Sequence, residues 1–163
     1  MPVRLRDPEI ARLVAERKVL PDDYRRRLQV RAKRGHKQQD LDLQGVEGSE
    51  FRLILRQSMN NALDFSVILA YRPPRSNQVF RLRRYNGKSH EHTNVIEGET
   101  FYDFHVHAAT ERYQDLGMRE DSFAEATDRF GDFDGAVRAL LADCSFEAPL
   151  KQQGVLFGEE IWP

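Results

Sequence analysis

Four of the five histidines in this chain lie within 18 residues, as two His-x-His pairs: His90 with His92, and His105 with His107. If each pair lies on a strand, its two imidazoles project from the same side, because side chains alternate along a strand. Imidazole titrates near neutral pH and is also a common metal ligand. The pairs therefore indicate either acid and base catalysis or binding of a metal ion.

In the first interpretation, His105 and His107 supply the acid and the base for attack of an RNA 2′-hydroxyl on the adjacent phosphodiester, and His92 orients or replaces one of them. This reaction needs no cofactor. A basic segment just upstream could bind phosphate and stabilise the transition state. Its tyrosine could stack on a base. The candidate nucleic-acid-binding residues are Arg81, Arg83, Arg84, Tyr85 and Lys88.

In the second interpretation, the histidines bind a divalent transition metal as the cofactor, since neutral imidazoles suit Zn, Fe, Ni and Cu. The segment HVHAATE is similar to the first metal-binding motif of cupins. No histidine follows His107, so the second cupin motif is absent and a cupin is disfavoured. The candidate metal ligands are His90, His92, His105, His107 and Glu111.

In a third interpretation, the histidines have no chemical role and form hydrogen bonds with polar neighbours such as Asn94, Asp103 or Tyr113. The protein would then be a non-enzymatic interaction module. Its basic strand, or the apolar C-terminal segment GVLFGEEIWP, would bind another protein or a second copy of the chain.

The histidines are expected on the last strands of a sheet. Hydrophobic alternation and the turn dipeptide Asn86-Gly87 predict a five-stranded antiparallel meander. On its third strand, Arg81, Arg83 and Tyr85 are expected to share one face. If the fourth and fifth strands pair so that His92 faces His105, all four imidazoles share one surface, and a one-residue slip separates the pairs. The five strands are expected over 51–57, 63–71, 79–85, 89–95 and 101–109.

Helices are expected on both sides of the meander in the sequence. Asp7 and Pro8 are typical of a helix start, and a second helix is expected from Asp22 to Gly35, so that residues 1–47 form a helical hairpin and a connector. Two C-terminal helices are expected to pack on one sheet face: a short one over 123–130 and an amphipathic one over 133–144. The predicted fold class is α+β, with a core domain over 48–146 and an apolar tail over 147–163.

Composition and charge limit the class of protein. With 163 residues, 40% of them hydrophobic, the chain can form one core. Residues 51–90 carry eight Lys/Arg against one acidic residue, whereas residues 91–163 carry 16 acidic residues against five basic ones. This asymmetry indicates a basic face that could meet phosphate. Cys144 is the only cysteine, and no apolar run is long enough for a membrane helix, so we expect a cytoplasmic protein.

The central stretch resembles a family of uncharacterised small prokaryotic proteins, a domain of unknown function. The elements that carry the resemblance are RLRRYNG, then His92-Thr93-Asn94, then His105-Val106-His107 followed by Tyr113. The extra histidine, His90, departs from the family pattern. The resemblance implies that His92, Asn94, His105 and His107 are the positions to test, and it implies no established activity. Together with the basic strand, these residues favour a small nucleic-acid-acting protein, a metal-independent ribonuclease, with the metal-binding protein and the interaction module as alternatives.

Overall fold

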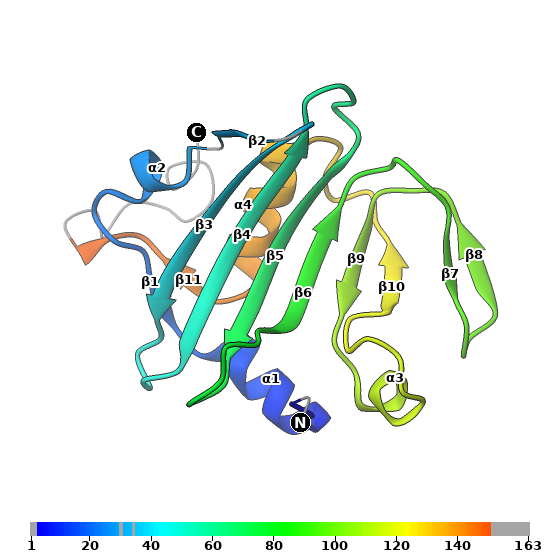
Figure 1. Ribbon diagram of the computed structural model, residues 1–163, viewed down its shortest axis with the longest axis horizontal. Coiled ribbons are helices and arrows are strands. Elements are labelled where there is room, and N and C mark those ends of the chain that lie inside the picture. Colours follow the sequence, from blue (N-terminus) through cyan, green and yellow to red (C-terminus); the bar gives the residue numbers. More distant parts are fainter. Residues whose placement is uncertain (1–2, 30, 34, 151–163) are drawn as a thin grey trace.

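A computed structural model describes residues 3–29, 31–33 and 35–150 of the chain. Its main element is a seven-stranded antiparallel sheet with the strand order β10-β9-β6-β5-β4-β3-β2 (Figure 1). The predicted α+β class is therefore confirmed. The strands of this sheet are β2 (Arg31–Lys33), β3 (His36–Gln44), β4 (Glu50–Ser58), β5 (Phe65–Arg72), β6 (Phe80–Asn86), β9 (His105–Ala108) and β10 (Phe123–Ala126).

The remaining elements are short, apart from two helices. Strands β1 (Lys18–Val19) and β11 (Phe146–Glu147) form a parallel pair, and β7 (His92–Asn94) and β8 (Glu99–Phe101) form an antiparallel hairpin. The helices are α1 (Asp7–Ala15), α2 (Tyr24–Arg27), α3 (Glu111–Asp115) and α4 (Phe133–Asp143). No helix in the described ranges is long and apolar enough to cross a membrane.

The core lies between the sheet and α4, which Figure 1 shows behind β4 and β5. Side chains alternate along each strand, so β4 and β5 direct residues such as Leu53 and Leu69 toward this helix. The buried stripe of α4, which includes Val137 and Leu140, meets them. Asp132 caps α4 by accepting a hydrogen bond from the N–H of Gly135 at 2.7 Å. We call the opposite side of the sheet, which carries the alternate residues, the outer face.

The sheet is wider than the predicted meander, because two polar segments are strands. The segment 36–44, expected as a connector, is β3, and 31–33, expected as helix, is β2. Strand β3 contributes Leu41 to the core opposite Leu53, while its other side chains are mostly polar. A strand near the edge needs only a few apolar residues on one side, so its composition resembles that of a loop. The expected helical hairpin reduces to α1 and the four-residue α2.

The C-terminal half also differs from the prediction. Residues 92–94 pair with β8 outside the main sheet, so β9 pairs directly with β6. Residues 123–126, expected as a helix, form the edge strand β10, which leaves α4 as the one long helix that covers the sheet in the described part of the chain. Residues of α1 and α2, such as Leu13 and Tyr24, belong to the same hydrophobic core as the sheet. The segment GVLFGEEIWP, which was predicted to bind another protein or a second copy of the chain, lies within residues 151–163, outside the described residues.

Candidate metal centre

Strand β9 holds His105 and His107 on the outer face, between β6 and β10. His105 lies between Asn86 and Ala126, and His107 lies between Arg84 and Ala124. Both histidines are almost completely buried, with 3% and 4% of their surface exposed. Because the neighbours on β10 are alanines, little side-chain bulk stands beside the two imidazoles on that side. The β7–β8 hairpin occupies this position.

Asn94 attaches that hairpin to the sheet. Its Nδ2 donates to the carbonyl oxygen of Ala124 at 2.7 Å, and its Oδ1 accepts from the N–H of the same residue at 2.9 Å. The buried side chain thus forms with β10 the two hydrogen bonds that a strand would form. Thr93 and Thr100 join the two strands of the hairpin through their hydroxyls at 2.9 Å. As a result His92, two residues before Asn94, is brought to the histidines of β9.

The three imidazoles of His92, His105 and His107 converge. One ring nitrogen from each can be chosen so that all three lie within 4.8 Å of one another. The ring centroids are 4.9 Å apart for His92 and His107, 4.9 Å for His105 and His107, and 5.5 Å for His92 and His105. Three imidazoles bound tetrahedrally to one ion at about 2.0–2.1 Å would have centroids about 5 Å apart. The three rings are therefore spaced as ligands of one metal ion would be.

The hydrogen bonds of the rings determine which nitrogens are available. His105 Nδ1 and His107 Nδ1 each lie 2.7 Å from a main-chain carbonyl oxygen, of Asp103 and Asp121 respectively. A carbonyl oxygen only accepts, so both Nδ1 atoms carry the proton and both Nε2 atoms keep a lone pair. His92 Nε2 lies 2.8 Å from Asn94 Oδ1, which also only accepts, so His92 keeps its lone pair on Nδ1. Metal-binding histidines are usually held by such hydrogen bonds from the other nitrogen.

The electrostatics keep the two β9 imidazoles uncharged. Burial, reinforced by the positive charge of Arg84, lowers the pKa of His107 to about 2, and burial is also the main cause that lowers the pKa of His105. Neutral imidazoles are the form that binds metals. A general acid must carry a proton near neutral pH, so these shifts disfavour the acid role expected of His105 or His107.

A hollow of about 230 Å³ is lined by two of the three histidines, His92 and His107. Arg84 and Asp121 stand in its wall, and Arg84 Nε donates to Asp121 Oδ2 at 3.0 Å. Asp121 is fully buried, and its main-chain carbonyl is the acceptor of His107. The hollow is lined by Arg84, His92, Thr93, His107, Met118, Arg119, Asp121 and Ser122.

Two other candidate ligands lie outside the cluster. His90 is exposed and its Nδ1 contacts Ser89 Oγ at 3.1 Å. Glu111 binds the start of α1, because its carboxylate accepts from Arg6 Nη1 and from the N–H of Asp7, both at 2.8 Å. The structure therefore brings together His92, His105 and His107, and the similarity to the cupin motif does not extend to Glu111.

A bulge divides the candidate nucleic-acid-binding residues of β6. Ala70 pairs with Arg81 but its neighbour Leu69 pairs with Arg83, so the alternation shifts by one residue between them. Arg81 and Arg84 consequently lie on the outer face, whereas Arg83 and Tyr85 lie on the α4 side. The bulge contradicts the expectation that Arg81 shares a face with Arg83 and Tyr85.

The two remaining aromatic and basic candidates are placed differently. Tyr85 is 1% exposed and its hydroxyl donates to Asp143 in a short hydrogen bond, so its ring is not available to stack on a base. Lys88 follows β6 and its Nζ lies 5.8 Å from the centroid of the Tyr102 ring.

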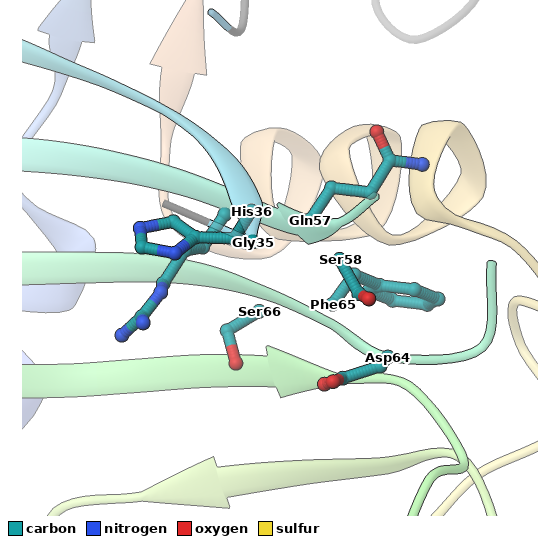
Figure 2. A pocket seen from close by; sticks show the side chains of 8 residues that line it. Gly35, His36, Gln57, Ser58, Asp64, Phe65 and Ser66 are labelled. Atoms are coloured by element: carbon teal, nitrogen blue, oxygen red, sulfur yellow. The ribbon is translucent and has the colours of Figure 1, made fainter. Parts of the chain in front are cut away.

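A second hollow, of about 380 Å³, lies on the outer face at the ends of β3, β4 and β5 (Figure 2). Figure 2 shows Ser66 and Asp64 on one side of it and His36 on the other. Ser66 Oγ donates to Asn86 Oδ1 at 2.9 Å, and Asn86 pairs with His105, so one row of outer-face residues runs from this hollow to the histidines. It is lined by Gly35, His36, Arg56, Gln57, Ser58, Asp64, Phe65 and Ser66.

Sequence reasoning missed several residues around the centre, notably Asp121, Arg119 and Arg56. Asp121 and Arg119 lie in the irregular segment between α3 and β10, which has no periodicity that could place them beside His107. Arg56 lies within the predicted strand 51–57, and only the strand pairing places it in the row that leads to His105.

No family model matches the chain, and no curated protein and no solved structure is significantly similar to it. The resemblance to a family of uncharacterised prokaryotic proteins stays a prediction. The interpretation of the site therefore depends on its geometry and chemistry.

Proposed function

We propose that His92, His105 and His107 bind one divalent transition metal ion and that the protein is a metal-dependent enzyme. The observation that carries the proposal is that the three ring nitrogens with free lone pairs belong to rings that converge, while the opposite nitrogens are bound to oxygen acceptors. Three neutral nitrogen ligands suit Zn, Fe, Ni or Cu. Zinc sites with three protein ligands keep a position open for water or substrate, which is typical of catalytic sites.

Metal-independent ribonuclease activity is a weaker candidate. It needs one histidine that gives up a proton and one that accepts it. The two imidazoles of β9 are neutral for the reasons given above, and both Nδ1 protons are bound to carbonyl oxygens. The basic side chains on the outer face remain compatible with a nucleic-acid substrate. Binding of nucleic acid by these side chains does not depend on whether the histidines bind a metal.

The proposal is tested by the metal content of protein purified without a histidine tag. We expect about one transition metal ion per chain after purification or after reconstitution of chelator-treated protein, because one set of three ligands holds one ion. His92→Gln, His105→Gln and His107→Gln should each lower the affinity for the metal by at least tenfold. His90→Gln is the matched control, since His90 lies outside the cluster, and it should bind metal like the parent.

Two results would contradict the proposal. A folded parent protein that takes up no Zn, Fe, Ni or Cu would leave the histidines with a structural role. RNA cleavage that persists in excess chelator and disappears in His105→Gln would instead support the metal-independent ribonuclease.

A further inference from the structure

We propose that the hollow beside the histidines is an oxyanion subsite, in which Arg84 and Arg119 bind a phosphate-type group of the substrate. The inference deepens the proposed function and depends on it for the metal-bound substrate, although the two can be tested separately. The walls of the hollow include His92 and His107 as well as both arginines. A ligand in this space would therefore lie beside both arginines and beside His92 and His107.

Arg84 keeps most of its hydrogen-bond donors available for a ligand, although it is held by Asp121. Its Nε donates to the fully buried Asp121, and its two terminal nitrogens form no hydrogen bond with any described residue. A guanidinium held at Nε keeps four further N–H donors in a rigid plane. Such a group binds carboxylate or phosphate through two parallel hydrogen bonds. The short strand pairing with His107 fixes Arg84 at the side of the candidate metal centre.

Arg119 adds a second positive charge that is only loosely held. Its Nε lies 3.7 Å from Asp121 Oδ1, which is beyond hydrogen-bond distance, and its side chain is 58% exposed. Asp121 Oδ1 itself is buried and has no hydrogen-bond partner in the described part of the chain. Arg119 can therefore turn toward a ligand without breaking a hydrogen bond to Asp121.

The charge balance favours an anion. Two guanidinium groups face the single carboxylate of Asp121, so the wall carries a net positive charge before any metal is bound. Two arginines at one anion are typical of phosphate recognition, where each contributes charge and directional donors. Phosphate can come from a phosphomonoester or from a phosphodiester chain, and the outer face offers a way to distinguish them.

Arg56 lies on the outer face in the row Arg56, Ser66, Asn86, His105, one residue on each of four adjacent strands. Three strand spacings separate it from His105, a distance of about 14 Å. Arg56 is exposed and forms no ion pair with any described residue. A phosphodiester chain that enters the subsite could reach Arg56, whereas a small phosphomonoester could not.

The experiment measures binding of inorganic phosphate by calorimetry, to the metal-free and the metal-loaded full chain at fixed ionic strength. Arg119→Ala should weaken binding about tenfold, because it removes one charge-assisted contact. Arg84→Lys, which keeps the charge and loses the planar fork, should weaken it as well. Arg75→Ala is the control: it removes the same charge from the exposed loop after β5, at the end of that strand away from Ser66.

Equal affinities in Arg119→Ala and Arg75→Ala would overturn the subsite, because only the overall charge would then matter. If the chain binds no metal but phosphate binding still depends on Arg119, the subsite stands and the proposed metal function fails. If metal binds and phosphate does not, the subsite alone fails.

The same variants identify the source of the phosphate. A mononucleotide and a single-stranded RNA of about ten nucleotides serve as the two probes. For a phosphodiester substrate, Arg56→Ala weakens binding of the RNA and leaves the mononucleotide unaffected. For a phosphomonoester substrate, Arg56→Ala changes neither affinity, and the mononucleotide depends on Arg119 like inorganic phosphate.

Discussion

The side-chain amide of Asn94 pairs with both main-chain polar groups of Ala124, at 2.7 and 2.9 Å. Ala124 is itself the strand neighbour of His107. One buried asparagine therefore sets the position of the β7–β8 hairpin relative to β9. Its Oδ1 also accepts the proton of His92 Nε2, so the same residue determines where His92 lies and which of its nitrogens is free.

Asn94→Ala should disrupt the metal centre without removing a ligand. The change eliminates three hydrogen bonds and leaves the buried N–H and C=O of Ala124 unpaired, which should lower the free energy of unfolding by about 1–3 kcal/mol. Metal affinity should fall by 10-fold to 100-fold, the usual effect of losing a hydrogen bond that orients a ligand. Titration with zinc and denaturant unfolding check the two effects. Thr93→Ala, on the same strand but exposed, should change metal affinity much less, and equal losses in both variants would contradict the role of Asn94.

The fold could be predicted where hydrophobic periodicity was strong. The stripe of α4 and the alternation of β4 and β5 placed these elements correctly, because both bury a continuous apolar face. Strand β3 was missed because Leu41 and Leu43 are its only apolar residues. Strand β10 was missed because Phe123 and Ala126 also fit one face of a helix, and a four-residue segment is too short for its period to distinguish the two.

The candidate site was only partly predictable. The His-x-His spacing placed His105 and His107 on one side of a strand, which follows from local geometry alone. The sequence offered pairing with 89–95 as the way to bring in His92, but His92 arrives by folding of a separate hairpin over β10. The bulge in β6 and the position of Asp121 depend on tertiary packing, and no local pattern signals either one.

Gly87 should tolerate no side chain. It follows β6, where a Cβ would lie 1.9 Å from the carbonyl oxygen of Leu63, which is main chain and cannot move aside easily. Gly87→Ala should therefore destabilise the protein by at least about 2 kcal/mol through steric strain. Gly131→Ala is the matched control, since nothing lies within 4 Å of its added Cβ and its φ is not positive. Thermal unfolding compares the two, and a similar melting temperature for both variants would count against the close approach.

Lys18 should be essential for holding the C-terminal ends of α1 and α4 together. The side chain is completely buried, and its Nζ donates to the carbonyl oxygens of Leu13, Val14, Glu16 and Cys144 at 2.6–3.0 Å. These carbonyls stand at or near the C-terminal ends of the two helices, where they have no partner within the helix. Lys18→Met keeps the length of the side chain but leaves the carbonyls unpaired, which should cost about 2–4 kcal/mol. Denaturant unfolding measures the loss, and Lys88→Met, at a half-buried loop position, should cost much less.

Acidification should destabilise the metal-free protein through His107. Its folded-state pKa of about 2 lies far below the ordinary imidazole value of 6.5, because burial and Arg84 oppose its protonation. Between these values the unfolded chain binds a proton that the folded chain does not, so stability is greatest above pH 6.5 and falls as the pH drops. The expected slope is about 1.4 kcal/mol per pH unit for this residue well below pH 6.5, and the lowered pKa of His105 adds to it in the same direction.

Denaturant unfolding at pH 7.5, 6.5, 5.5 and 4.5 measures this slope in chelator-treated protein. His107→Gln keeps a polar side chain of similar length but has no titrating group, so it should be less stable than the parent at pH 7.5 and lose less stability on acidification. If the parent and His107→Gln have the same slope, His107 takes up its proton in the folded protein as readily as in the unfolded chain, and the argument against its role as a general acid fails.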